Sequence, residues 1–234
     1  MPLPDDLKFD AASFSGVARL FPLPNLVMFP HVLQPLHIFE PRYRALLEEA
    51  LDDDRLIAMA VLAPGWEADY EGCPDVCSVA CLGRVATHQR LDEGRYNLLL
   101  AGLARVHIVE ELPSRKLFRE VKVEVYQDHY PPAATARRSQ VHKELFDCFR
   151  GLVPSAPAAN AQLEQLLRAE LSLGMLTDIV AYTLELDVAY KETLLRERNV
   201  DRRAALLLRR LSGAAGRATL RDASGKFPPD FSAN

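Results

Sequence analysis

The stretch at residues 20–51 constrains the fold of this chain most, because prolines divide its apolar residues into short runs that end in one helical pattern. The first run, residues 17–23, and the second, residues 32–38, have the length and composition of strands. Proline has no N–H to donate to a strand ladder, so we expect these runs at strand ends, at bulges or at a sheet edge. The stretch predicts a pair of strands joined by an ordered, proline-stiffened loop that carries Phe29.

A helix is expected directly after the second run. Pro41 occupies a favoured first helical position, and the apolar residues that follow share one helical face, namely Tyr43, Leu46, Leu47, Ala50 and Leu51. An amphipathic helix of this kind needs an apolar surface to cover, so we expect it to pack against a sheet. The acids Asp52, Asp53 and Asp54 follow where the helix dipole disfavours them. We interpret them as the end of the helix and not as a metal site.

Further strand signals follow this helix. Residues 56–62 form a nearly uninterrupted apolar run, which is typical of a strand buried on both faces. Runs at 77–89 and 95–101 flank LDEG, a hairpin signal in which Gly94 can adopt a positive φ. Alternation of apolar and polar residues continues at 103–110 and 117–126. The runs from 77–89 to 117–126 predict an antiparallel meander. With the earlier strands they make six or seven segments, enough to close a small barrel.

The composition changes at residues 129–136, HYPPAATA, and helical periodicity prevails beyond them. Apolar stripes begin at Val141, Leu163 and Leu176, which predicts a bundle of four or five helices over residues 129–212. Asp187 is expected to cap one of these helices. Asn199 is expected to end that helix in a left-handed conformation, and Asp201 to cap the last helix. Residues 1–16 read as a flexible N-terminal arm and residues 213–234 as a C-terminal tail.

The order of these segments resembles a known family, the N-terminal (LON) domain of ATP-dependent Lon proteases, and especially the stand-alone bacterial proteins that consist of this domain. The resemblance extends from about residue 17 to about residue 211. It rests on LFPLPNLVMFPHVLQPLHIFEPRYRALLEEAL, DRLIAMAVL, GRVATHQRLDEGRYNLLLAGLARVHI and LTDIVAYTLELDVAYKETLLRERNVDRRAALLLRRL. Glu40 and Arg42, in FEPRY, resemble a family hallmark, and we interpret both as structural.

The resemblance implies an α+β fold: a PUA-like β-barrel subdomain over residues 17–128, which includes the early helix, followed by an all-helical bundle subdomain over residues 129–212. It also implies a role in recognising polypeptide substrates or protein partners. The expected function is therefore that of a non-enzymatic polypeptide-binding module. An RNA- or nucleotide-binding PUA-like protein is the alternative.

The composition is that of an ordinary globular protein. A net charge of -4 over 234 residues excludes a global field strong enough to imply nucleic acid or an anionic membrane as the main partner. No leader-like segment and no apolar run of membrane-spanning length is seen, so the cytoplasm is the expected compartment and no membrane partner is expected. Neither the physiological partner nor the oligomeric state is indicated.

The sequence predicts no catalytic, cofactor-binding or metal-binding residue. The one Gly-Lys pair, Gly225-Lys226, has Leu220 where a phosphate-binding loop needs its first glycine and Phe227 where it needs Ser or Thr. No serine has a recognisable setting beside a base. Cysteines 73, 77 and 81 lack the paired CxxC spacing of a structural zinc site, and Cys148 is remote. We interpret them as small apolar or loop residues.

Two groups of residues are candidates for binding. Phe29, Trp66 and Tyr70 lie in segments punctuated by Gly or Pro, where aromatic rings supply contact area at low entropic cost. The other interpretation of Trp66 is that it folds back to cap the barrel. The arginines of the last helix repeat at seven-residue spacing and suit phosphate or RNA, or else form a solvated face paired with acids: Arg202, Arg203, Arg209 and Arg210.

Overall fold

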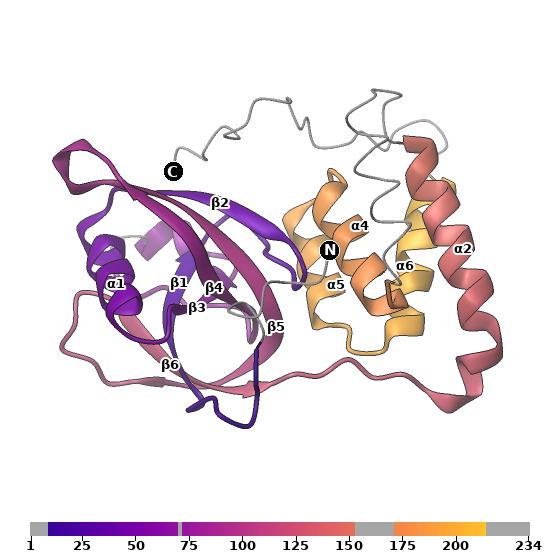
Figure 1. The fold of residues 1–234 in the computed structure, drawn as a ribbon, viewed down its shortest axis with the longest axis horizontal. Helices are drawn as coiled ribbons and strands as arrows, with labels where there is room; N and C mark the ends of the chain where they lie inside the picture. The colour runs from indigo at the N-terminus through magenta and orange to yellow at the C-terminus, as the bar shows by residue number, and fades with distance from the viewer. Residues whose placement is uncertain (1–8, 70–71, 153–170, 214–234) are drawn as a thin grey trace. The chain divides into compact units, whose positions relative to one another are not determined.

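The computed structural model describes residues 9–69, 72–152 and 171–213, which divide into two units between Gln127 and Asp128 (Figure 1). Tyr70, residues 163–170 of the predicted stripe that begins at Leu163, and residues 214–234 of the predicted C-terminal tail lie outside the described residues. The first unit holds one main helix and six strands in its described part. These are β1 (Val17–Leu23), β2 (Leu33–Ile38), α1 (Pro41–Asp52), β3 (Leu56–Val61), β4 (Val79–Arg90), β5 (Tyr96–Leu112) and β6 (Arg119–Val125).

The six strands belong to one sheet, in the order β2-β5-β4-β3-β1-β6. β4, β5 and β6 pair in succession as an antiparallel meander, as predicted, and β3 pairs antiparallel with β4. The runs predicted at 95–101 and 103–110 form one strand, β5, and not two. β5 pairs with both β4 and β6, so the pairings of β5, β4, β3, β1 and β6 form a closed circuit. The first two strands do not pair with each other: β1 lies between β3 and β6, and β2 pairs with β5. β2 stands at the end of the strand order with Pro35 inside it, as expected of an edge strand.

Side-chain alternation along the strands explains where the core lies. Alternate residues of β1, β3, β4, β5 and β6 point to one side and form a buried cluster of small and aliphatic residues that includes Leu20, Leu82 and Val106. Phe9 and Phe14, which the sequence assigns to a flexible arm, pack against this cluster. Every residue of β3 is buried, as its uninterrupted apolar run predicts.

The helix α1 covers the other face of β1. Its buried residues are Tyr43, Leu46, Leu47 and Ala50, four of the five that share the predicted apolar face. The rings of Tyr43 and Phe21 meet edge to face with centroids 4.2 Å apart. A parallel pair of strands needs a long crossover, and α1 lies in the connection between the parallel strands β1 and β3.

The loop between β1 and β2 is ordered but does not present Phe29 to solvent. The Phe29 side chain is 0% exposed, so the expectation that it offers a contact surface is wrong. The loop crosses β5 at Gly102, which donates to the Val32 carbonyl at 2.9 Å and accepts from the His31 N–H at 2.9 Å. A Cβ atom at Gly102 would overlap the Phe29 carbonyl oxygen. Because glycine has no Cβ atom, the loop can pass close to Gly102 and bury Phe29 in the core.

The second unit is helical in its described part. It contains α2 (Thr135–Leu152), α4 (Leu173–Thr183), α5 (Val188–Arg196) and α6 (Val200–Gly213). Asp187 caps α5 as expected, accepting from the Tyr190 N–H at 2.7 Å. The start of α6 differs from the prediction: the Asn199 side chain accepts from the backbone of Asp201 and of Arg202, both at 3.1 Å. Asn199 is therefore the N-cap, and it has no positive φ.

Candidate functional site

A pocket of about 260 Å³ opens in the first unit, where the end of β1 meets the start of α1. Pockets for drug-sized ligands are roughly 300–1,000 Å³. This pocket therefore suits one or two side chains better than a nucleotide or a cofactor. Its lining comes from five places in the chain and consists of Leu20, Pro22, Arg42, Tyr43, Leu62, Gly72, Cys73, Pro74, Leu117, Phe118 and Arg119.

The first wall of the pocket is built by β1 and α1. Tyr43, in the first turn of α1, donates its hydroxyl to the Pro22 carbonyl oxygen at 3.1 Å. This bond uses an acceptor at the end of β1 and fixes the helix start against the strand. Arg42 ion-pairs with Glu40 at 2.9 Å, and its guanidinium lies 4.7 Å from the centroid of the Tyr43 ring. The two charged residues of FEPRY therefore pair with each other beside the start of α1.

Arg119, at the start of β6, holds the second wall of the pocket, which the segment around Pro74 forms. Its Nε and Nη2 bind the two oxygens of Glu111 at 2.8 and 2.5 Å, and its Nη1 donates to the Pro74 carbonyl oxygen at 2.9 Å. Burial acts to lower the pKa of Arg119, but hydrogen bonds to Glu111 outweigh burial, and the net pKa is raised. The loop around Pro74 is therefore held to the sheet by a permanently charged side chain.

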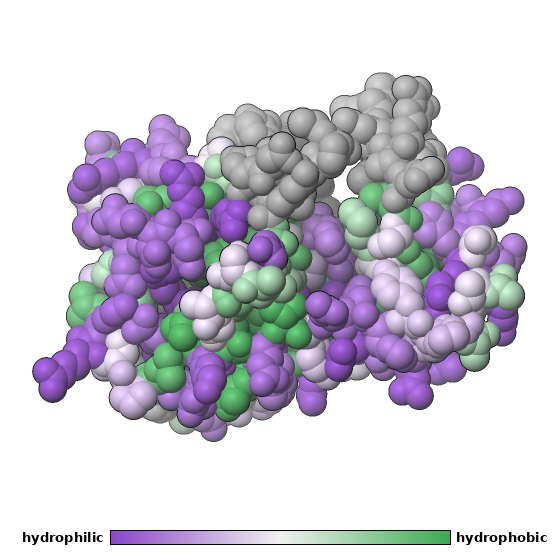
Figure 2. Space-filling model, turned by 60° about the horizontal axis from the view of Figure 1, so that its bottom comes forward, coloured by the Kyte–Doolittle hydropathy of each residue, from purple (hydrophilic) through white to green (hydrophobic). Residues whose placement is uncertain are grey.

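The rim of the pocket is apolar and exposed. Leu117 is 70% exposed, the largest value among the exposed large hydrophobic residues in the described part, whereas Phe118 beside it is buried. Lys116 lies over the Phe118 ring, with Nζ 5.3 Å from the centroid. Figure 2 shows apolar surface, in green, among hydrophilic surface on the first unit. Leu117 belongs to one pocket lining with Leu20, Leu62 and Phe118, so it is not an isolated apolar residue on the surface.

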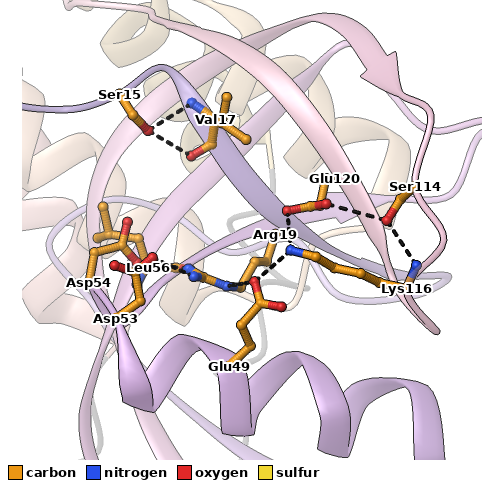
Figure 3. A network of polar contacts seen from close by, with 10 residues as sticks. All are labelled: Ser15, Val17, Arg19, Glu49, Asp53, Asp54, Leu56, Ser114, Lys116 and Glu120. Atoms are coloured by element: carbon orange, nitrogen blue, oxygen red, sulfur yellow. Dashed lines mark hydrogen bonds and ion pairs between the residues drawn. The ribbon is translucent and has the colours of Figure 1, made fainter.

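An ion-pair network continues from Lys116 to β1 and α1 (Figure 3). Lys116 contacts Glu49 at 2.8 Å and Glu120 at 2.9 Å. Arg19, whose side chain is largely buried, binds Glu49 at 3.1 Å. Arg19 also binds the acids that follow α1, Asp53 at 2.6 Å and Asp54 at 2.8 Å. These acids therefore mark the helix end, as interpreted, and they also neutralise a buried arginine.

The network makes the stability of the fold depend on pH through Glu49. Burial acts to raise the pKa of Glu49, but hydrogen bonds from Lys116 and Arg19 outweigh it, and the net pKa lies below its ordinary 4.5. The ionised Glu49 therefore stabilises the fold above pH 4.5, and this contribution is lost as the pH falls through the lower, folded-state value. Because Glu49 is partly exposed, we expect Glu49→Gln to lower the free energy of unfolding by less than about 1 kcal/mol at neutral pH.

Urea unfolding of the natural protein and of Glu49→Gln, at neutral pH and well below pH 4.5, tests this expectation. The difference between the two proteins should shrink in acid. Glu110→Gln is the matched control, since Glu110 pairs with Lys122 at 3.5 Å in an exposed position. A Glu49 difference that is equal at both pH values would contradict the prediction.

The aromatic candidates predicted from sequence do not come together at this pocket. Trp66 begins a 3-10 helix, η2 (Trp66–Asp69), and is partly buried. It does not belong to the pocket lining, although the segment that follows it leads to Gly72 and Cys73. Tyr70 lies outside the described residues. The sequence carried no signal for Leu117, because its place in the pocket lining depends on a segment that meets β1 and α1 only in the fold.

The arginine stripe of α6 is divided by the fold. Arg203 is 0% exposed, and its guanidinium binds Asp128 at 2.8 and 3.0 Å, Thr177 at 2.8 Å and the Glu197 carbonyl oxygen at 2.8 Å. Arg203 is thus not available to phosphate, which corrects that part of the prediction. Arg202, Arg209 and Arg210 are exposed. The alternative of RNA binding therefore rests on three arginines.

The cysteines differ in exposure. All four are free thiols: Cys73 is exposed and lines the pocket, Cys77 and Cys148 are partly buried, and Cys81 is buried. Cys81 matches the expectation of a small apolar core residue.

Within the ranges that the structure describes, no helix combines the length and the apolar character needed to cross a membrane.

Comparisons with known proteins agree on one relationship. Residues 17–213 match the family described as the ATP-dependent protease La (LON) substrate-binding domain. The chain is 25% identical over 202 residues to Lon protease 2 of Myxococcus xanthus, and 25% identical over 203 residues to Lon protease of Anaeromyxobacter dehalogenans. Each alignment covers 84% of this chain and 23% of the relative, so the chain spans about a quarter of the length of these curated relatives.

Solved structures give the same fold. The N-terminal domain of the Mycobacterium avium complex Lon protease superposes with a TM-score of 0.66 at 16% identity, over 85% of this chain and 99% of that one. A Lon N-terminal domain protein from Xanthomonas campestris superposes with a TM-score of 0.57 at 18% identity, over 82% and 97% of the two chains. The mixed α+β fold is therefore similar to that of Lon N-terminal domains. Because the family match extends over residues 17–213, this chain belongs to the family of LON substrate-binding domains.

Proposed function

We propose that this protein is a non-enzymatic module that binds polypeptide, either unfolded segments or an exposed segment of a partner. The observation that carries the proposal is its membership of a substrate-binding family over residues 17–213. The similarity to Lon proteases covers 23% of those proteins and matches the substrate-binding part. A role in binding polypeptide, without catalysing a reaction, is the function that we infer from this match.

The pocket supports the proposal and suggests where binding occurs. Its lining is mainly apolar, and Leu117 extends the apolar surface to the rim. Recognition of unfolded polypeptide requires such a surface, because an unfolded chain exposes the apolar side chains that folded proteins hide. Trp66 remains a candidate for a neighbouring contact, since its segment leads to Gly72 and Cys73 in the pocket lining.

We also propose two further properties of this protein. The closed circuit of strand pairings in the first unit supports a PUA-like β-barrel. The cytoplasm stays the proposed compartment, where unfolded polypeptide would be met. Neither proposal is needed for the binding test.

Binding to a reduced and alkylated model protein, which cannot refold, tests the proposed function. We expect fluorescence anisotropy of the labelled unfolded protein to rise on titration with this protein, and the folded form of the same model protein to give no such rise. The binding should need no ATP. Because burial of apolar surface drives it, it should change little with salt, whereas RNA binding weakens steeply as salt rises.

A single-stranded RNA oligonucleotide serves as the second ligand in the same assay. Binding of RNA and not of unfolded protein, lost in Arg209→Ala, would replace the proposed function with its alternative. Absence of binding to the unfolded protein would by itself reject the proposal. Trp66→Ala tests the neighbouring contact, with a weaker affinity expected if the ring touches the polypeptide.

A further inference from the structure

We propose that the corner where α1 meets the turn between β4 and β5 binds a phosphate group through Arg44 and Arg90. The ligand is a phosphate dianion, either a free ion or a phosphate monoester such as a phosphorylated side chain. Neither arginine belongs to the pocket lining, so this site is distinct from the pocket. The inference does not depend on the proposed function, and each can fail without the other.

Arg44, on α1, is a partly buried arginine whose charge is not paired. Its Nε is buried and has no hydrogen-bond partner. Within residues 9–69, 72–152 and 171–213, no ion pair joins Arg44 to a carboxylate. A buried donor without an acceptor costs free energy, and so does a partly buried charge without a counter-ion. An anion beside this guanidinium would offset that cost by pairing with the charge.

Gly94, in the turn between β4 and β5, fixes the position of the Arg44 guanidinium. A Cβ atom at Gly94 would overlap Nη2 of Arg44 and would lie 3.4 Å from its Nε, so this edge of the guanidinium packs against the glycine. The group is planar, with three nitrogens spread around Cζ. Nη1 therefore points away from Gly94, and its donors are the ones available to a ligand.

Arg90, at the end of β4, brings the second positive charge. It is exposed, it pairs across the strands with Tyr96, and its Cζ lies 5.9 Å from the centroid of the Tyr96 ring. Burial and a hydrogen bond to Glu48 raise the pKa of Tyr96 overall, whereas the charges of Arg90 and Arg44 act to lower it. Because such effects fall with distance, both guanidinium groups lie near the Tyr96 hydroxyl.

The carboxylates of this corner do not neutralise the two arginines. Glu48, one turn after Arg44, accepts from the Tyr96 hydroxyl at 2.9 Å. The acids of the turn, Asp92 and Glu93, are exposed, and Glu93 lies 3.8 Å from Arg95. In the part of the chain that the structure describes, none of these acids forms an ion pair with either arginine of the site. The two cations are thus left for a ligand.

Two arginines at one corner favour phosphate over carboxylate. A phosphate monoester carries a charge of about −1.5 to −2 at pH 7 and three strong acceptor oxygens, so it can pair with both guanidinium groups. Nucleic acid is disfavoured, because its binding depends on several phosphate contacts along the strand and the chain has a net charge of -4. The site therefore suits one isolated phosphate group.

NMR spectra of the arginine Nε–H groups test the proposal in the full chain, with Arg44→Gln and Arg90→Gln assigning the two signals. At constant ionic strength, we expect inorganic phosphate to shift both signals saturably and chloride to shift neither. Arg90→Gln should weaken phosphate binding about tenfold, as loss of a hydrogen bond to a charged group does. Absence of a saturable shift at both signals would overturn the proposal.

Arg115→Gln is the matched control. Arg115 is exposed in the first unit and lies outside the site, so the variant loses the same charge. Its affinity for phosphate should stay within about twofold of that of the natural protein. Equal losses in Arg115→Gln and Arg90→Gln would show that only the overall charge matters, which would overturn the site. Because Arg90 is exposed, Arg90→Gln decides the question even if Arg44→Gln does not fold.

Three labelled peptides on one Gly/Ser backbone identify the source of the phosphate, with phosphoserine, serine or glutamate at the centre. Tighter binding of the phosphoserine peptide than of inorganic phosphate would support a phosphate carried by polypeptide, and equal affinities would support the free ion. The phosphoserine peptide should bind more weakly below about pH 6, where its phosphate loses the second charge. Equal affinities for the glutamate and phosphoserine peptides would overturn the choice of phosphate. Displacement of phosphate by a single-stranded RNA without a terminal phosphate would overturn it as well.

Discussion

Replacing Arg203 with alanine is expected to lower the free energy of unfolding by about 3–5 kcal/mol, as breaking a buried ion pair does. The guanidinium of Arg203 is fully buried and binds both oxygens of Asp128. It also lies 3.6 Å from Asp178, which is fully buried too. Alanine would leave both carboxylates without this cation, and water could not replace it at the buried Asp178. Arg203→Lys should recover part of the loss, since it keeps the charge but not the bidentate geometry.

Arg210→Ala is the matched control, seven residues along the same helix. Arg210 is exposed and lies over the Tyr190 ring at 5.8 Å, so its removal should cost less than about 1 kcal/mol. Far-UV circular dichroism follows the helical unit, and the fluorescence of Trp66, the only tryptophan, follows the first unit. Arg203→Ala should shift the circular dichroism transition most. Equal losses in the two variants would show that burial does not separate these arginines.

Replacing Phe29 with alanine should also cost about 3–5 kcal/mol, the usual range for a buried aromatic side chain. Its ring is fully buried beneath a loop that passes close over Gly102. The cavity left behind is hard to fill, because the loop backbone is bonded to Gly102 on both sides through His31 and Val32. The Trp66 fluorescence transition in urea should move to lower denaturant concentration, since Phe29 belongs to the first unit.

Leu33→Ala separates a core effect from a surface effect. Leu33 follows the same loop but is 51% exposed, and a substitution there should change stability by about 0.5 kcal/mol or less. Polypeptide binding gives a second criterion. Phe29→Ala, measured where it is still folded, should bind the unfolded model protein with unchanged affinity. A loss of affinity in the folded variant would restore Phe29 as a contact residue.

Local patterns in the sequence were enough to place most of the elements. The apolar run at 56–62 became a strand with every residue buried, and Pro41 began α1. Asp187 capped α5, and Gly94 has the positive φ that LDEG predicts. Each of these features depends on residues close in the chain, through the periodicity of side chains, the fixed φ of proline or a cap bond three residues long. Local signals of this kind do not need the rest of the fold.

Pairing between distant strands was harder to predict. β1 and β2 look like partners because they are neighbours in sequence, yet β1 pairs with β3 and β6 and β2 pairs with β5. Short runs of similar composition can pair in many ways at nearly equal local energy. The observed strand pairing is the one that buries both faces of the sheet, with α1 on one face and the aliphatic cluster on the other.

The sequence by itself determined the family, the α+β class and the approximate positions of most described elements, because these follow from patterns within short segments. Only the tertiary structure decided which of several similar residues are buried and which are exposed. Arg203 is buried and Arg210 exposed on one helix, and Phe29 is buried while Leu117 stands at the rim of a pocket. Whether a residue is buried depends on segments that are distant in sequence. Asp128 pairs with Arg203, and Gly102 allows close passage of the loop that carries Phe29. No local pattern carries that information.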